Sequence, residues 1–107
     1  MENRRYQRAL LDVPVEFEVK GGGARGAGTA RDISLGGMFI ETASPIAFNS
    51  PVVVYLTIPR HPGPLAFPGI VRWAREGGMG IQFSLLGARE THAITEHTRA
   101  KSSPGFR

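Results

Sequence analysis

The chain has 107 residues, the length of one ordinary domain with a single core. Its composition, 41% hydrophobic and 21% charged, is that of a globular protein, and no run approaches the ~18 consecutive apolar residues of a membrane-spanning helix. The absence of cysteine excludes disulfides and thiolate metal ligands, while the net charge of +4 favours a negatively charged partner such as a nucleotide, a nucleic acid or a lipid headgroup.

The turn-forming residues indicate the fold class. The chain contains 14 glycines and 8 prolines, which are unfavourable inside helices and useful in turns. Many short strands fit this composition better than a bundle of helices, so we predict an all-β core. No apolar segment follows the N-terminal arginines, and we therefore expect a cytoplasmic protein that does not insert into a membrane.

The first elements in chain order are an arm and a hairpin. Residues 1–11 are expected to form a flexible basic arm, because the run is too short for an independent helix. Apolar and polar residues then alternate through 13–19, which predicts a half-buried strand. Glycines at 21–23 predict a turn, and residues 25–33 should return antiparallel. The small residues 26–28 allow a sharp bend or the close approach of another backbone.

Four more strands are expected, at residues 38–42, 52–58, 67–74 and 79–83. The run 52–58 is apolar on nearly both faces, so we expect the C-terminal segment to cover its outer side. Alternation places Phe67 and Trp73 on one face of the fifth strand, where core packing is the expected role and a base-stacking platform the alternative. Six strands within about 75 residues predict a closed barrel.

The end of the chain changes character. Prolines are absent from residues 85–101, and Leu86, Ala93, Ile94 and Ala100 lie roughly on one stripe, which predicts a weakly amphipathic helix that packs on the barrel. Residues 102–107 should be a disordered tail. The expected organisation is therefore the arm at 1–11, the barrel with its C-terminal α-helix at 12–101, and the tail.

A polar turn separates the second and third predicted strands. Asp32 and Ser34 are two residues apart, so in an extended segment both side chains point to the same side. Gly36 and Gly37 follow, and without a Cβ they let another group approach the main chain closely. Such a turn can form one side of a ligand site, although Asp beside glycine is also common in turns that bind nothing.

A second cluster lies near the N-terminus, where Arg4, Arg5 and Arg8 form either a solvated basic tail or a set of anion-binding groups. Arg4 to Arg8 gives RxxxR, and Asp32, Ser34 and Gly37 give DxSxxG. Together, in this order and at this separation, the two motifs resemble those of the PilZ domain, the bacterial receptor module for cyclic di-GMP. The order of segments and the later pieces 71–73 and 80–83 extend the resemblance over roughly residues 3–100.

The resemblance implies a six-stranded antiparallel PilZ-type β-barrel with a C-terminal α-helix, and it implies roles for the motif residues. Arg4 and Arg8 would clamp phosphate and guanine, because an arginine fork bonds either a phosphate or guanine O6 and N7. Asp32 would accept the N1–H and the exocyclic amine of guanine, a pattern that adenine does not offer. Ser34 and Gly37, with Gly36, would hold the base on the barrel. The supporting candidates are Arg5 and Arg31.

This reading predicts a binding module that uses no cofactor and takes cyclic di-GMP as its ligand. We expect the arm to close over bound ligand and to create a surface for an unidentified downstream effector protein, in motility, attachment or exopolysaccharide control. Two alternatives stay open. One is a PilZ-like adaptor that binds no nucleotide, and the other is a basic barrel that binds single-stranded nucleic acid. The main hypothesis, a cyclic di-GMP receptor, predicts that nucleic acid is not a partner.

Catalytic and metal sites have little support in the sequence. Ser34 lacks the strand–turn–helix context of a hydrolase nucleophile, and we predict no enzyme. His61 lies in a proline-rich loop, while His92 and His97 are five residues apart, which is not the i, i+4 spacing of helical metal ligands. We therefore predict no metal site and expect all three histidines at the surface.

Overall fold

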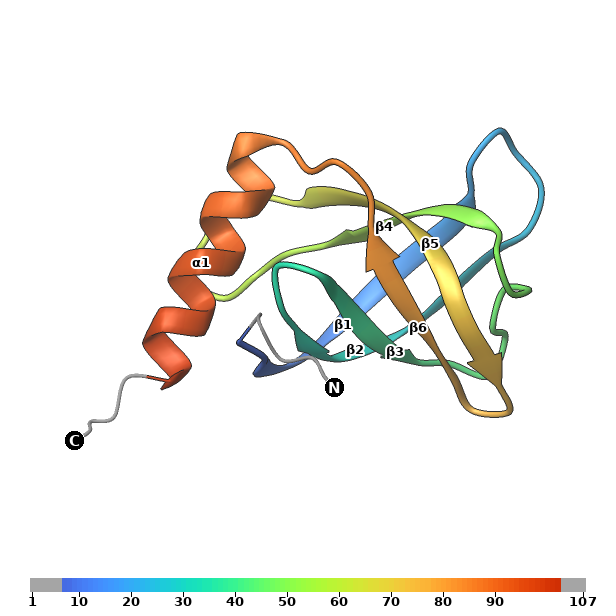
Figure 1. Ribbon diagram of the computed structural model, residues 1–107, viewed down its shortest axis with the longest axis horizontal. Helices are drawn as coiled ribbons and strands as arrows, with labels where there is room; N and C mark the ends of the chain where they lie inside the picture. The colour runs from blue at the N-terminus through green and yellow to red at the C-terminus, as the bar shows by residue number, and fades with distance from the viewer. Residues whose placement is uncertain (1–6, 103–107) are drawn as a thin grey trace.

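The computed structural model describes residues 7–102. In this part of the chain six antiparallel strands close into a barrel in the order β1-β2-β3-β6-β5-β4, and one helix follows (Figure 1). The elements are β1 (Ala9–Val19), β2 (Arg25–Ile33), β3 (Gly37–Glu41), β4 (Pro51–Leu56), β5 (Leu65–Arg75), β6 (Gly78–Phe83) and α1 (Ala88–Ser102). The predicted all-β class, the closed six-stranded barrel and the C-terminal helix are confirmed.

The first strand is longer than predicted. β1 begins at Ala9, so residues 9–11, which we expected in the flexible arm, are part of the barrel. The ladder between β1 and β2 shifts between Leu10 and Val13, and within this bulge Asp12 has a left-handed φ of 52°. A bulge interrupts the alternation of apolar and polar residues, which explains why the pattern from Val13 onward did not reveal the start of the strand. At the other end of the chain, α1 includes Ser102, and the rest of the predicted tail lies outside the described residues.

The predicted glycine hairpin joins β1 to β2. Gly21, Gly22 and Gly23 have φ values of 91°, 99° and 115°, a region that side chains rarely allow. Beyond the turn, Gly26 of β2 faces Phe17 of β1, and the Phe17 ring occupies the space that a Cβ on Gly26 would need. The small residues of β2 therefore give Phe17 its place inside the barrel.

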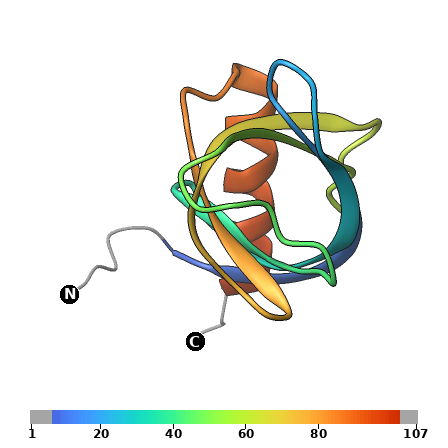
Figure 2. The same ribbon diagram turned by 90° about the vertical axis from the view of Figure 1, so that its right-hand side faces the viewer.

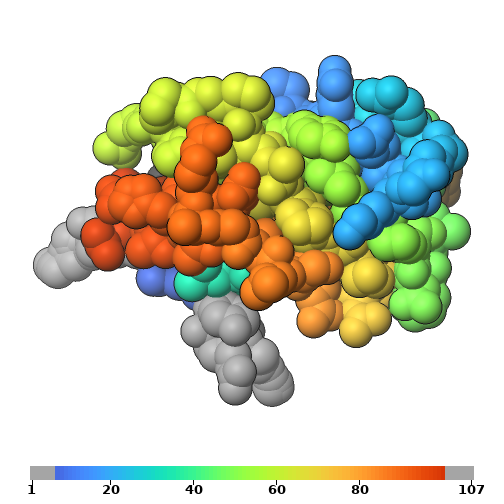
Figure 3. All heavy atoms as spheres, turned by 90° about the horizontal axis from the view of Figure 1, so that it is seen from above, coloured from blue at the N-terminus to red at the C-terminus, as the bar shows by residue number. Residues whose placement is uncertain are grey.

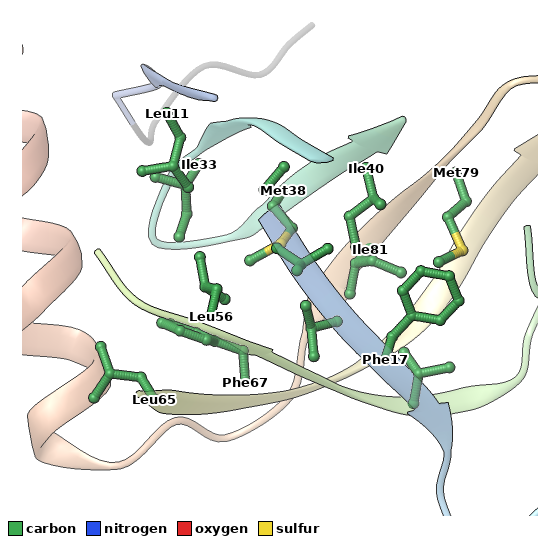
Figure 4. Close-up of a cluster of buried hydrophobic side chains, with 14 of the residues drawn as sticks. Leu11, Phe17, Ile33, Met38, Ile40, Leu56, Leu65, Phe67, Met79 and Ile81 are labelled. Carbon is green, nitrogen blue, oxygen red and sulfur yellow. The ribbon is translucent and has the colours of Figure 1, made fainter. Parts of the chain in front are cut away.

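The core fills the barrel with side chains from all six strands (Figure 4). The largest fully buried apolar side chains are those of Phe17, Ile33, Met38, Ile40, Val52, Val54, Ile58, Phe67, Val71, Met79 and Ile94. Full burial of one such side chain stabilises the fold by about 1.5–3 kcal/mol relative to leaving it in water. Because the alternating residues of each strand point inward, the polar residues between them form the outer wall.

Helix α1 closes one end of the barrel, as the view along the barrel shows (Figure 2). Ala93 and Ile94 are 1% and 0% exposed, and the helix contacts β1 and β5. Two expectations were wrong here. The outer face of β4 is open, with Tyr55 38% exposed, and His97 is buried at 6% exposure instead of lying at the surface. Among residues 7–102, no helix has both the length and the apolar character needed to cross a membrane.

Candidate functional site

The two sequence motifs meet at an ion pair. Arg8 immediately precedes β1, and Asp32 is the penultimate residue of β2. The pairing of Leu10 with Asp32 brings them together, and Arg8 donates from Nη2 and Nε to Asp32 Oδ1 at 2.9 and 3.2 Å. Arg4 and Arg5 lie outside the described residues. The second arginine of RxxxR and the aspartate of DxSxxG therefore form one charged contact at the barrel surface.

The turn after Asp32 is held by its own backbone and hydroxyl group. The Ser34 N–H donates to the Gly37 carbonyl at 2.8 Å, and the Gly36 N–H donates to Ser34 Oγ at 3.1 Å. Ser34 is 1% exposed, and its hydroxyl lies 3.5 Å from the Gly37 carbonyl as a donor. The expected common polar face of Asp32 and Ser34 is thus divided, because β2 ends at Ile33 and the alternation stops there.

Gly37 is required by the neighbouring strand. A Cβ at this position would overlap the backbone carbonyl of Ile81 in β6, to whose ladder Gly37 belongs. The Gly36 carbonyl also accepts a hydrogen bond from the Phe83 N–H at 2.9 Å. The turn is therefore fixed against β6, and the need for glycine at 37 has a structural reason whether or not a ligand lies there.

A row of residues crosses the outer wall of the barrel from Asp32. Asp32 pairs with Phe39, Phe39 with Gly80, and Gly80 with Trp73. The Phe39 and Trp73 rings stack with centroids 5.4 Å apart and an interplanar angle of 21°. Gly80 lies beneath them, since a Cβ there would overlap the Trp73 indole, and the Arg75 guanidinium lies 4.9 Å from the Trp73 ring centroid. The row joins a carboxylate to an aromatic pair.

The position of Trp73 corrects the sequence-based expectation. Phe67 is fully buried, whereas Trp73 is 39% exposed, so the two do not share the inner face. The ladder between β5 and β6 shifts between Val71 and Trp73, and the extra residue, Arg72, turns the rest of the strand to the outside. Strict alternation had no way to reveal this bulge, although the end of the apolar run at Arg72, with Arg75 and Glu76 soon after it, is a signal of the change of face.

A groove of about 220 Å³ lies between the end of the arm and this aromatic pair. It is lined by Arg8, Ser34, Gly36, Gly37, Met38, Phe39, Arg72, Trp73, Gly80, Ile81 and Gln82. Arg72 Nε donates to Gln82 Oε1 at 2.6 Å, and Gln82 is the strand partner of Gly37. The candidate residues Arg8, Ser34, Gly36 and Gly37 all line this groove. Trp73, for which a base-stacking role was the alternative, lines it too, whereas the sequence analysis did not identify Phe39, Arg72 and Gln82 as site residues.

The arginines near the groove differ in whether they can contact a ligand there. Arg31, a supporting candidate, is ion-paired with Asp12 at 3.1 Å and with Glu41 at 3.5 Å on the outer wall. Arg8 and Arg72 line the groove and offer guanidinium groups to an anion or to a base edge. Asp32 contributes the acceptor, and the Phe39 ring an apolar surface. These groups suit a ligand that combines a planar base with phosphate.

A larger groove, of about 490 Å³, lies elsewhere, between α1 and the loop that joins β4 to β5. Figure 3 shows this yellow-green loop beside the orange and red helix. The groove is lined by His61, His92, His97 and Glu96, among others, and contains none of the motif residues. The His61 and His92 ring centroids are 6.4 Å apart. Among residues 7–102, no three His, Cys, Asp or Glu side chains are grouped to hold a metal ion.

Comparison with known proteins assigns the fold to a family. The PilZ domain matches residues 2–100. Comparison with curated protein sequences gave no match. Among solved structures, the PilZ domain of CeSA from a cellulose-synthesising bacterium aligns with a TM-score of 0.69 at 18% identity, over 89% of this chain and 94% of that one.

Two further structures have the same fold. The Bacillus subtilis inhibitor of motility, MotI/DgrA, aligns with a TM-score of 0.73 at 16% identity, over all of this chain and 55% of its own length. The PilZ domain of YcgR from Escherichia coli, solved with cyclic di-GMP, aligns with a TM-score of 0.67 at 15% identity, over 96% and 99% of the two chains. With the family match covering nearly the whole sequence, the chain belongs to the PilZ domain family.

Proposed function

We propose that this chain is a cytoplasmic, non-enzymatic receptor for cyclic di-GMP, which binds in the groove between the N-terminal arm and the Phe39–Trp73 pair. The observation that carries the proposal is the contact of Arg8 Nη2 with Asp32 Oδ1 at 2.9 Å, because it unites the two motifs beside this groove. The E. coli YcgR domain of the same family, whose structure contains cyclic di-GMP, supports the choice of ligand.

The chemistry of the groove matches the ligand. Guanine presents N1–H and an exocyclic amine, and the Asp32 carboxylate can accept both. Its Oδ1 already accepts from Arg8, so ligand binding exchanges an Arg8 hydrogen bond for guanine donors and frees the guanidinium for a phosphate or for O6 and N7. The Phe39–Trp73 pair supplies an apolar wall, and Arg72 a second cation. Base, phosphate and hydrophobic contacts are thus all provided.

The arm completes the site in this proposal. Arg4 and Arg5, together with Arg8, would close over the bound dinucleotide. These arginines precede the barrel in the chain, whereas Asp32 belongs to strand β2 and is fixed to the sheet. Hydrogen exchange of residues 3–10 with and without cyclic di-GMP tests this closure. We expect slower exchange on saturation, and unchanged exchange would contradict closure.

Calorimetric titration tests the site itself. We expect the wild type to bind cyclic di-GMP with a dissociation constant on the order of micromolar, which corresponds to about 8 kcal/mol. Arg8→Ala and Asp32→Ala should each weaken binding by tenfold or more, because each removes hydrogen bonds to a charged group, worth about 1.5–3 kcal/mol. Arg89→Ala is the matched control, since Arg89 is an exposed arginine on α1 outside the groove. Equal binding by all four proteins would contradict the site.

A second candidate function has one observation in its favour. Trp73 is 39% exposed, follows Arg72 in the sequence and has the Arg75 guanidinium 4.9 Å from its ring centroid. Proteins combine exposed aromatic rings and cations in this way to stack single-stranded bases without sequence preference. Such binding would strengthen with oligonucleotide length, weaken steeply with salt and be insensitive to Asp32→Ala. The receptor proposal instead predicts that the chain binds cyclic di-GMP and that Asp32→Ala weakens this binding.

The output of the receptor passes to an effector protein, in motility, attachment or exopolysaccharide control. The names of two structural neighbours support these processes, since one is an inhibitor of motility and another comes from a cellulose-synthesising bacterium. Binding without catalysis predicts that cyclic di-GMP incubated with the protein is recovered intact, as chromatography of the mixture would show.

A further inference from the structure

One buried polar side chain of α1 reaches the strand that carries the arm. His97 is 6% exposed, and its Nε2 lies 2.8 Å from the carbonyl oxygen of Leu10. A carbonyl only accepts, so the His97 Nε2–H is the donor in this contact. Leu10 follows Arg8 by two residues and is the strand partner of Asp32. His97 is thus bonded to the backbone directly beside the ion pair of the ligand groove.

The start of β1 has few hydrogen bonds of its own. Ala9 and Leu10 pair with β2 before the ladder shifts, and pairing resumes only at Val13. The pairing of β1 with β4 is confined to Glu16–Val19, at the far end of the strand. This short piece, which we call the arm root (residues 8–12), is therefore separated from the main ladder by a bulge. Beyond these two pairs and the burial of Ala9 and Leu11, its position depends on contacts with other elements.

Ala9 and Leu11 of the arm root are buried and Arg8 pairs with Asp32, and two further polar contacts join the arm root to the rest of the molecule. Asp12, in the bulge, forms an ion pair with Arg31 at 3.1 Å, but both side chains are about half exposed, at 55% and 48%. Exposed pairs of this kind contribute little in water. The His97 bond is different, because His97 is buried and the loss of its donor would leave the Leu10 carbonyl without that partner in a partly buried site. His97 is the stronger of the two tethers.

Packing alone does not explain why residue 97 is a histidine. The neighbours of His97 on the inner side of α1, Ala93 and Ile94, are apolar and almost fully buried. An apolar residue at 97 would cover the barrel end without the cost of burying an imidazole. The polar ring is explained by its bond to Leu10. On its other side, His97 lines the groove between α1 and the β4–β5 loop, so it connects the arm root to an open surface.

We infer that His97 is a positioning residue for the ligand groove: it fixes the arm root so that Arg8 reaches Asp32, and it thereby couples α1 to ligand binding. The coupling to ligand rests on the proposed function, whereas the tether to the arm root does not. Since linkage is reciprocal, bound ligand stabilises the docking of α1 by the same factor as docked α1 strengthens ligand binding.

The first experiment needs no ligand. Hydrogen exchange of residues 8–13 is compared in the wild type, His97→Leu and His97→Gln, with amides of β6 as the internal reference. His97→Leu removes the donor and keeps an apolar body, so exchange of the arm root should rise by about tenfold while β6 is unchanged. His97→Gln retains an N–H and should restore protection. Unchanged exchange at 8–13, or an equal rise in β6 and the arm root, would overturn the tether.

The second experiment measures coupling to the ligand. His97→Leu should weaken cyclic di-GMP binding by about tenfold, and His97→Gln should recover most of it. In an Arg8→Ala background His97→Leu should have a much smaller effect, because Arg8 is the groove residue that the arm root places. An undiminished loss in that background would overturn the positioning role. If the wild type binds no cyclic di-GMP, the proposed function fails, and the ligand-free exchange still decides whether His97 holds the arm root.

Discussion

Arg8 and Asp32 form an ion pair whose side chains are 54% and 28% exposed. Pairs this accessible to water typically contribute only about 0.2–1 kcal/mol to stability, so the pair does little to hold the barrel together. The small contribution suits a binding site, because guanine and phosphate can take over the hydrogen bonds at little cost. At the scale of residues, the proposed function makes the pair two ligand-binding groups that satisfy each other in the free chain.

Gly80 determines where Trp73 lies, which gives a direct test of the aromatic wall. A Cβ in Gly80→Ala would overlap the indole, so Trp73 should leave Phe39 and become more exposed. Trp73 is the only tryptophan in the chain, and its emission should therefore shift to longer wavelength. Loss of a stacking surface costs about 1–3 kcal/mol per base, so cyclic di-GMP binding should weaken roughly tenfold or more.

The control for this prediction is the same change in a Trp73→Ala background. There, Gly80→Ala should leave affinity unaltered, because the ring that it displaces is already gone. Unshifted tryptophan emission in Gly80→Ala would show that the indole does not depend on the missing Cβ.

Tyr55 and Glu18 give a pH-dependent prediction on the opposite side of the barrel. The Tyr55 hydroxyl donates to Glu18 Oε2 at 2.7 Å, and this hydrogen bond, with burial and the Glu18 charge, raises the pKa of Tyr55 above its ordinary value of 10.0. The protonated phenol is the form that the fold favours. Its contribution to stability is present below pH 10 and is lost as the pH rises through the folded pKa.

Ultraviolet titration of the phenolate checks this sign. In a Tyr6→Phe background, which leaves Tyr55 as the only tyrosine, the midpoint should lie above that of free tyrosine. Glu18→Gln should lower the midpoint, because it removes the carboxylate charge and weakens the hydrogen bond. A midpoint insensitive to Glu18→Gln would mean that Glu18 is not the cause.

At the scale of elements, the bulges mark the limit of what the sequence could predict. Apolar runs, alternation and turn residues together located all six strands, and β2 has the predicted bounds, because its glycine turn and its polar turn are both visible in the sequence. The bulges in β1 and β5 are set by how neighbouring strands align, which one strand's sequence does not encode. They account for the early start of β1 at Ala9 and for the outward Trp73.

The candidate site also contains residues that the sequence could identify and residues that it could not. The motif residues Arg8, Asp32, Ser34 and Gly37 were found because both motifs are local in the sequence, and the structure brings them to one groove and its rim. Phe39, Arg72 and Gln82 were missed because they come from three strands that are brought together only by pairing. The buried position of His97 was missed for a related reason, since its partner is the backbone carbonyl of Leu10, 87 residues away.

Helix α1 makes a prediction at the scale of elements. Ile94 is fully buried where the helix closes the barrel, so Ile94→Ala should lower the free energy of unfolding by about 2–5 kcal/mol, through lost burial and the cavity left behind. Thr91→Ala, on the exposed side of the same helix, should change it by less than about 0.5 kcal/mol. Urea unfolding of both variants measures the difference, and equal midpoints would show that α1 is not part of the cooperative core.

For the molecule as a whole, the closed barrel is a rigid support for one face. The row from Asp32 through Phe39 and Gly80 to Trp73 crosses four neighbouring strands, each held by hydrogen bonds on both sides. In the proposed function, the acceptor and the aromatic wall keep their spacing when cyclic di-GMP binds, and the response falls on the parts attached to the barrel ends, the arm root and α1. The inferred tether through His97 would give these two parts a common response.

Discrimination between two dinucleotides tests the central claim most directly. In matched calorimetric titrations of the wild type, cyclic di-GMP should bind saturably, and its adenine counterpart should bind at least about tenfold more weakly, because adenine has neither the N1–H nor the C2 amine from which Asp32 is proposed to accept hydrogen bonds. Asp32→Ala should abolish most of that difference. Equal affinity for the two dinucleotides, or no binding of cyclic di-GMP, would contradict the account.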